Sequence, residues 1–94
     1  MEDLALKGTA GTEAKNDAVI QVELMGDSIN IEIHSKVEKL YGQAIRDDVE
    51  QVLAEYSITG ANILVNDLGA WDFVIKARTE TAIKRALAKK EAVK

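Results

Sequence analysis

The sequence predicts an α+β fold, a two-layer ββαββα sandwich in which two helices cover one face of a four-stranded, mainly antiparallel sheet. Two observations predict this fold. Apolar and polar residues alternate in two pairs of short segments, as they do in half-buried strands. After each pair, apolar residues recur every three or four positions, as they do in amphipathic helices.

The first strand pair is predicted by alternation over residues 20–24 and 29–33. Gly26, Asp27 and Ser28 lie between the two segments. These residue types are common in tight turns, because glycine adopts backbone conformations that other residues avoid and short polar side chains bond to the turn backbone. The sequence therefore predicts an antiparallel hairpin.

A long amphipathic helix is predicted to follow. Ser35 and Glu38 have the spacing of a capping box, in which the serine accepts a hydrogen bond from a free amide and the glutamate reaches back. Apolar residues then recur at helical spacing, and Gly60 marks the exit. The apolar positions are Val37, Leu40, Tyr41, Ala44, Ile45, Val49, Val52, Leu53 and Tyr56.

Alternation returns over residues 61–65 and 71–75, on either side of a turn sequence at 66–69. We expect a second hairpin here, with Trp71 pointing into the core. From about Thr79 the helical period is restored and runs toward the C-terminus.

The chain has 94 residues, which is enough for one domain and leaves no room for a second. Residues 1–17 contain two glycines and two threonines and have no sustained apolar period. We therefore expect a flexible N-terminal arm over residues 1–17 and a single α+β domain over residues 18–90.

Composition excludes several classes of function. With 16 acidic and 12 basic residues the net charge is −4, which argues against general nucleic-acid binding. Apolar runs fall far short of the roughly 18 residues that span a bilayer, so we expect no membrane association. The chain has no cysteine, which fits a reducing cytoplasm, and one histidine, which cannot form a multi-histidine metal site. We expect no metal.

The sequence shows no catalytic constellation. His34 is the only histidine, and it stands at the end of a predicted strand, where orientation by packing is expected rather than general-base catalysis. Residues 26–29, GDSI, are similar to the modification motif of phosphopantetheine carriers, but there the serine begins a helix. A strand pattern follows Ser28 here, so a turn is favoured over an attachment site.

Five segments, taken in order, resemble the gamma subunit of citrate lyase, the small acyl carrier protein of that complex, over about residues 8–88. The carrier of citramalate lyase fits equally well. The segments are AGT at 10–12, SKVEK at 35–39, YGQAIR at 41–46, VNDLGAWD at 65–72 and KAR at 76–78.

The resemblance implies a non-catalytic carrier subunit. Such carriers hold 2'-(5''-phosphoribosyl)-3'-dephospho-coenzyme A, joined to a serine by a phosphodiester, and its thiol bears acetyl or citryl as a thioester. The implied partners are an alpha subunit, the acyl transferase, which exchanges acetyl for citrate on the arm, and a beta subunit, the acyl lyase, which cleaves the citryl thioester.

The attachment residue departs from the family pattern. The family serine follows Ala-Gly-Thr after two further residues, a position occupied here by Lys15. A lysine amine cannot form the phosphodiester, whereas Thr12 and Ser28 have the required hydroxyl. Either the arm is modified unusually, or the chain is an unmodified carrier-like interaction or regulatory domain.

The resemblance also suggests a docking region, because loop residues positioned by a scaffold often bind partners. We expect Asp67, Gly69, Asp72 and Arg78 to contact the other subunits. The alternative is that the first two serve the turn and that Arg78 pairs with a nearby acid such as Glu80 or Asp72.

Overall fold

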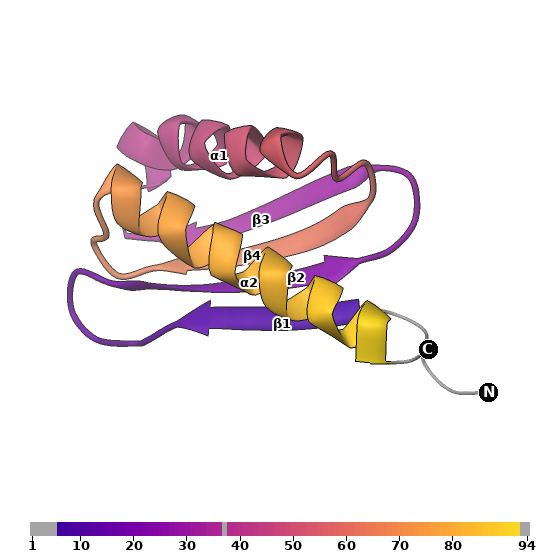
Figure 1. Ribbon diagram of the computed structural model, residues 1–94. Helices are drawn as coiled ribbons and strands as arrows, with labels where there is room; N and C mark the ends of the chain where they lie inside the picture. Colours follow the sequence, from indigo (N-terminus) through magenta and orange to yellow (C-terminus); the bar gives the residue numbers. More distant parts are fainter. Residues whose placement is uncertain (1–5, 37, 93–94) are drawn as a thin grey trace.

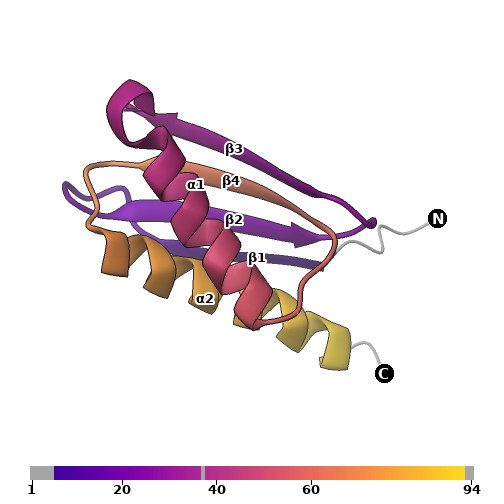
Figure 2. The same ribbon diagram turned by 90° about the horizontal axis from the view of Figure 1, so that it is seen from above.

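The computed structural model describes residues 6–36 and 38–92. The chain folds as a four-stranded sheet with both helices packed on one face (Figures 1 and 2), which confirms the predicted fold class. The elements are β1 (Leu6–Gly11), β2 (Ala18–Leu24), β3 (Ile29–Ser35), α1 (Glu38–Glu55), β4 (Ala61–Asp67) and α2 (Asp72–Ala92).

The strand order is β1-β2-β4-β3, with β3 parallel to β4 and the other neighbours antiparallel. The predicted hairpin of β2 with β3 is therefore wrong, because β4 lies between them. The start of β4 is held by both flanking strand ends: the Met25 amide donates to the Gly60 carbonyl at 3.3 Å, and the Ala61 amide donates to the Ser28 carbonyl at 3.0 Å. Alternation alone cannot distinguish a hairpin from two strands separated by a third.

Residues 6–11, predicted to be part of a flexible N-terminal arm, form the edge strand β1, with Leu6 opposite Leu24 and Gly11 opposite Val19. Gly8 lets this strand lie directly against α2, since a Cβ atom there would be 2.1 Å from the Ala82 carbonyl oxygen. Two glycines in six residues hide the strand pattern, because they carry no side chain that could register as apolar.

The strand predicted over residues 71–75 is the beginning of α2 instead. The Ile75 amide donates to the Trp71 carbonyl at 3.0 Å, which starts the helix. Ile75 is buried, whereas Trp71 and Phe73 are 70% and 71% exposed, so the expectation of a buried Trp71 is wrong. Three apolar residues at every second position fit a strand equally well until tertiary contacts select the helix.

The core lies between the sheet and the helices. Both helices contribute to it at the predicted spacing of three to four residues. Its buried residues include Ile20, Val22 and Val65 of the sheet, Ile45, Val49, Val52 and Leu53 of α1, and Ile75, Ile83 and Ala86 of α2. Neither described helix has the length and apolarity that a membrane crossing requires.

The close packing of β1 on α2 predicts that Gly8→Ala destabilises the protein. The new methyl group would collide with helix backbone, and such overpacking costs about 2–3 kcal/mol. We expect urea unfolding to show this loss, while Thr9→Ala, at an exposed position of the same strand, changes the free energy of unfolding by less than about 1 kcal/mol. Equal stability of Gly8→Ala and the native chain would contradict the packing described.

Candidate functional site

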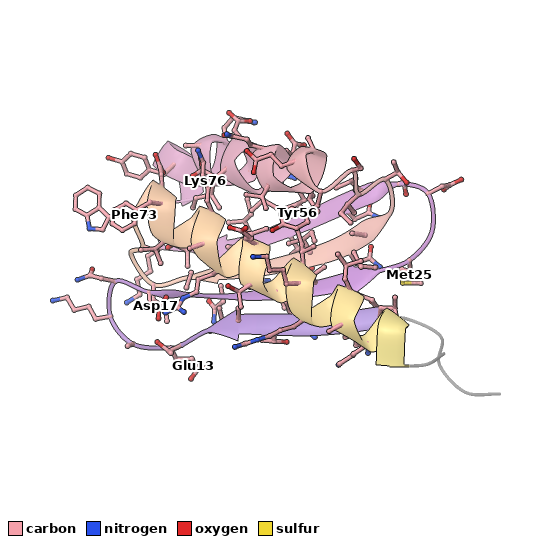
Figure 3. The ribbon with its side chains drawn as sticks, viewed as in Figure 1. Glu13, Asp17, Met25, Tyr56, Phe73 and Lys76 are labelled. Carbon is pink, nitrogen blue, oxygen red and sulfur yellow. The ribbon has the colours of Figure 1, made fainter. Side chains whose placement is uncertain are left out.

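One end of the sandwich, at the left in Figure 1, gathers the loop between β1 and β2, the β3–α1 junction, the turn between β4 and α2, and the first turns of both helices. We call it the loop end. It contains Thr12 and Lys15, in the loop at residues 12–17, together with the turn at residues 68–71. Ser28 lies at the opposite end, in the connection between β2 and β3. In Figure 3, Asp17 and Phe73 mark the loop end and Met25 marks the opposite end.

Asp17 anchors the loop at residues 12–17. Arg78 of α2 grips its carboxylate with two hydrogen bonds, from Nε to Oδ1 at 3.0 Å and from Nη2 to Oδ2 at 2.8 Å. The Thr12 hydroxyl donates to Oδ2 at 2.6 Å, and the Ala18 amide donates to Oδ1 at 2.7 Å. These donors, Arg78 first, hold the pKa of Asp17 well below its usual range, so the carboxylate stays charged.

The partner of Arg78 is thus Asp17, which is 61 positions away in the sequence, and not Glu80 or Asp72. Glu80 and Asp72 are close to Arg78 along the chain, whereas Asp17 approaches it only in the folded structure. This charged pair joins the loop to α2 and forms only when β1 and β2 lie beneath the helix.

The same loop is bonded to the β4–α2 turn. The Asn16 amide donates to the Leu68 carbonyl at 2.8 Å, and the Leu68 amide donates to the Asp17 carbonyl at 2.9 Å. Asn16 has a φ of 67°, in the left-handed region that asparagine tolerates better than most residues. The loop and the turn therefore form one structural unit.

Asp67 shapes this turn from inside. Its side chain is 6% exposed, and its Oδ1 accepts hydrogen bonds from the amides of Gly69 and Ala70 at 3.1 and 2.8 Å. Its Oδ2 accepts from the Ser35 hydroxyl at 2.9 Å. Gly69 supports the turn with a φ of 95°. Two of the four predicted docking residues, Asp67 and Gly69, are thus committed to local structure, although Gly69 is exposed.

The loop at residues 12–17 contains two of the predicted attachment residues. Lys15, the expected attachment position, is exposed, and its amine does not fit a phosphodiester. Thr12 has the only hydroxyl of this loop; its side chain is exposed, donates to Asp17 and accepts from the Ala14 amide at 3.3 Å. Within the loop, only Thr12 has a functional group that fits the prosthetic group.

A second feature of the loop end is a pair of neighbouring carboxyl groups on the two helices. Asp48 of α1 is 9% exposed, and its Oδ2 has no hydrogen-bond partner among the described residues. Burial, followed by the hydrogen bond with Asp72 and the charge of Asp72, raises the pKa of Asp48 to about 6, while the charge of Lys76 opposes this shift. Asp72 itself is exposed at the first residue of α2.

Beside this acid pair lies a cavity of about 410 Å³, between α1 and the β4–α2 turn. Its rim carries Tyr41, which is 55% exposed, and Trp71, which is 70% exposed. Ala44 and Ile45 line it from α1, and Asp72 lines it from α2. We call this cavity the aromatic pocket. Sequence reasoning missed it because both aromatic residues were expected to face the core.

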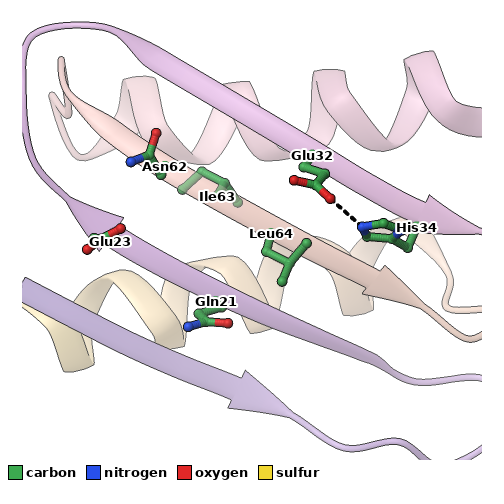
Figure 4. Close-up of a pocket in the computed structure, with 7 residues that line it drawn as sticks. All are labelled: Gln21, Glu23, Glu32, His34, Asn62, Ile63 and Leu64. Atoms are coloured by element: carbon green, nitrogen blue, oxygen red, sulfur yellow. Dashed lines mark hydrogen bonds and ion pairs between the residues drawn. The ribbon is translucent and has the colours of Figure 1, made fainter.

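The uncovered face of the sheet has a shallow depression (Figure 4), in which His34 and Glu32 form a contact of 2.5 Å between Nε2 and Oε2. Its lining residues are Gln21, Glu23, Glu32, His34, Asn62, Ile63 and Leu64. None of them carries a hydroxyl or thiol, so His34 has no nucleophile to activate there. Among the described residues, no group of three or more potential ligands is placed to hold a metal ion.

Comparison with known proteins matches residues 6–86 to the family described as "ACP: Malonate decarboxylase delta subunit (MdcD)". The "Citrate lyase acyl carrier protein" of Yersinia enterocolitica is 40% identical over 81 residues, which cover 85% of this chain and 84% of that protein. Proteins of the same name from Haemophilus influenzae and Lactococcus lactis are 44% and 40% identical, over 82% and 87% of this chain and 80% and 85% of their own lengths.

The bidentate pair predicts that Arg78→Gln loosens the loop at residues 12–17 while the rest of the domain stays folded. We expect faster amide hydrogen exchange at Asn16 and Leu68, measured by NMR, with unchanged exchange in the middle of β4. Lys76→Gln, two residues earlier on the same helix, serves as the control. Unchanged exchange at Asn16 in Arg78→Gln would show that the ion pair does not hold the loop.

The raised pKa of Asp48 predicts a pH-dependent stability. The unfolded chain loses this proton near its ordinary pKa of 3.8, whereas the folded chain keeps it until about pH 6. The folded state therefore binds more protons in this window, so stability falls as the pH rises through it.

Asp48→Asn removes the buried charge. We expect it to raise the free energy of unfolding at pH 7 by about 1–2 kcal/mol, with the gain vanishing near pH 4. Urea unfolding at both pH values measures the effect, and Glu50→Gln, at an exposed position of the same helix, is the matched control. A stability gain that is the same at pH 4 and pH 7 would contradict the assignment.

Proposed function

This chain belongs to the family of citrate lyase acyl carrier proteins, and from that membership we propose that it is the acyl carrier subunit of a cytoplasmic complex of the citrate lyase type. In this role it presents acetyl and citryl thioesters on 2'-(5''-phosphoribosyl)-3'-dephospho-coenzyme A to an alpha (acyl transferase) and a beta (acyl lyase) subunit. The observation that carries the proposal is 40–44% identity to proteins of that name over most of both chains.

The architecture of the loop end supports a carrier role. A carrier lowers no chemical barrier itself; it converts encounters with a free thioester into intramolecular ones and so raises the effective concentration. An exposed loop on a rigid domain suits that task. Arg78 holds the base of the loop through Asp17, while Glu13, Ala14 and Lys15 are exposed. The bound group supplies the thiol, and we propose Thr12 as the residue that holds it.

Lys15 favours a second candidate function. An amine at the family position is consistent with a chain that assembles with the other subunits but is never loaded, which makes it an interaction or regulatory domain. In that case the hydrogen bonds of the Thr12 hydroxyl to Asp17 and from Ala14 remain undisturbed.

The intact mass of the chain purified from its native host, with fragmentation to locate any added group, separates the two functions. We expect a mass increase equal to the phosphoribosyl-dephospho-coenzyme A group on Thr12. Thr12→Ser should keep the increase and Thr12→Val should lose it, whereas Ser28→Ala, at the opposite end of the molecule, should not change it.

Lys15→Ser provides the matched control, because it restores a hydroxyl at the family position. If Lys15→Ser becomes loaded in the same cells while the native chain keeps its unmodified mass, the transferase recognises this protein and Thr12 is not its acceptor. That result would replace the carrier proposal with the interaction domain.

A further inference from the structure

The aromatic side chains at the loop end are exposed to an unusual degree. Of the five large hydrophobic side chains exposed in the described residues, three lie here: Tyr41, Trp71 and Phe73. Burying one aromatic or aliphatic side chain of this size stabilises a protein by about 1.5–3 kcal/mol. Trp71 and Phe73 are about 70% exposed, so the free chain lacks most of this stabilisation at both residues. Clusters of this kind mark interaction sites, where tryptophan and tyrosine contribute most of the binding energy.

The aromatic pocket combines two of these rings with the carboxyl group of Asp72. Tyr41 and Trp71 stand on its rim, and Asp72 lies beside Trp71. Asp67 also borders the cavity, but its two oxygens already accept three hydrogen bonds within the chain. No ion pair joins Asp72 to a lysine or arginine within residues 6–36 and 38–92. Asp72 is therefore the group that a bound cation would meet.

The surroundings add negative charge behind this carboxylate. Asp48 is nine-tenths buried next to Asp72, and its Oδ2 has no partner among the described residues. Lys76 is the cation that acts on this pair, and Asp47 adds a further negative charge. The whole chain also carries a net charge of −4, which favours the approach of a positively charged surface.

We propose that the aromatic pocket binds an arginine side chain of a partner subunit, with the guanidinium against Trp71 and Tyr41 and paired with Asp72. A planar guanidinium stacks on aromatic faces and forms a bidentate pair, with two hydrogen bonds, to a carboxylate. A lysine ammonium lacks this planar, two-donor geometry. The cavity of about 410 Å³ exceeds the roughly 300 Å³ at which small-molecule sites begin, so it accommodates one long side chain.

The pocket is also placed where docking would serve a carrier. It shares the β4–α2 turn with the loop at residues 12–17, through the hydrogen bonds between Asn16, Asp17 and Leu68. A partner held at Trp71 therefore keeps that loop beside its own surface and raises the effective concentration of whatever the loop bears. The identity of the partner in this inference rests on the proposed function. The chemistry of the pocket does not.

The experiment uses Trp71, the only tryptophan of the chain, as the reporter. The full chain is labelled with 5-fluorotryptophan and titrated with the purified alpha and beta citrate lyase subunits of its own organism, while ¹⁹F NMR follows its single resonance. We expect one subunit to shift this resonance. Trp71→Ala and Asp72→Asn, measured by calorimetry, should each weaken binding by about tenfold or more.

Two variants act as controls. Trp71→Phe keeps an aromatic face and should retain most of the affinity, and Met25→Ala, at an exposed apolar position on the opposite end, should change it by less than about twofold. If Asp72→Asn binds as tightly as the native chain, the pocket does not recognise a cation. If Trp71→Ala also binds normally, the pocket is not the docking site.

The outcomes separate this inference from the carrier role. Normal binding by the Trp71 and Asp72 variants of a chain that carries the prosthetic group overturns only the pocket. Weakened binding by those variants of a chain with an unmodified mass overturns only the carrier role. Failure of the native chain to bind either subunit overturns the docking inference, and the mass measurement then decides the carrier role alone.

Discussion

The central position of β4 is the constraint on which the rest of the structure depends. It pairs with β2 on one side and with β3 on the other. It therefore joins these two strands into one sheet and brings together segments that are distant in sequence. The turn at residues 68–71 follows the C-terminal end of β4, so it lies at the loop end together with the loop at residues 12–17. The buried Asp67 then shapes that turn with three hydrogen bonds.

The ion pair between Asp17 and Arg78 links the loop end of the sheet to the helical layer. It joins the loop to α2, while the amides of Asn16 and Leu68 join the loop to the turn. An exposed loop with a rigid base is what presentation of a tethered group requires, since every flexible residue in the base would dilute the effective concentration. The same rigidity also suits a domain that only docks, which is why attachment chemistry, rather than the fold, separates the two proposed functions.

The loop end holds two kinds of chemistry side by side. The loop carries Lys15 and the Thr12 hydroxyl, and the aromatic pocket carries exposed rings with an acid pair behind them. Charge distinguishes the two regions, because Arg78 neutralises Asp17 at the loop whereas Asp48 and Asp72 face each other at the pocket. The two regions of the loop end therefore differ in charge as well as in the functional groups that they expose.

The sequence by itself determined the α+β class, the alternating strands β2, β3 and β4, the burial of Ile45, Val49, Val52 and Leu53 of α1, and the family, because these depend on local periodicity and on ordered short segments. Tertiary structure decided the strand order, the inclusion of residues 6–11 in the sheet, the helical state of residues 72–75, and the pairing of Arg78 with Asp17. It also decided that Trp71 faces outward. These features depend on contacts between residues far apart in the chain, and periodicity carries no information about which distant segments will meet.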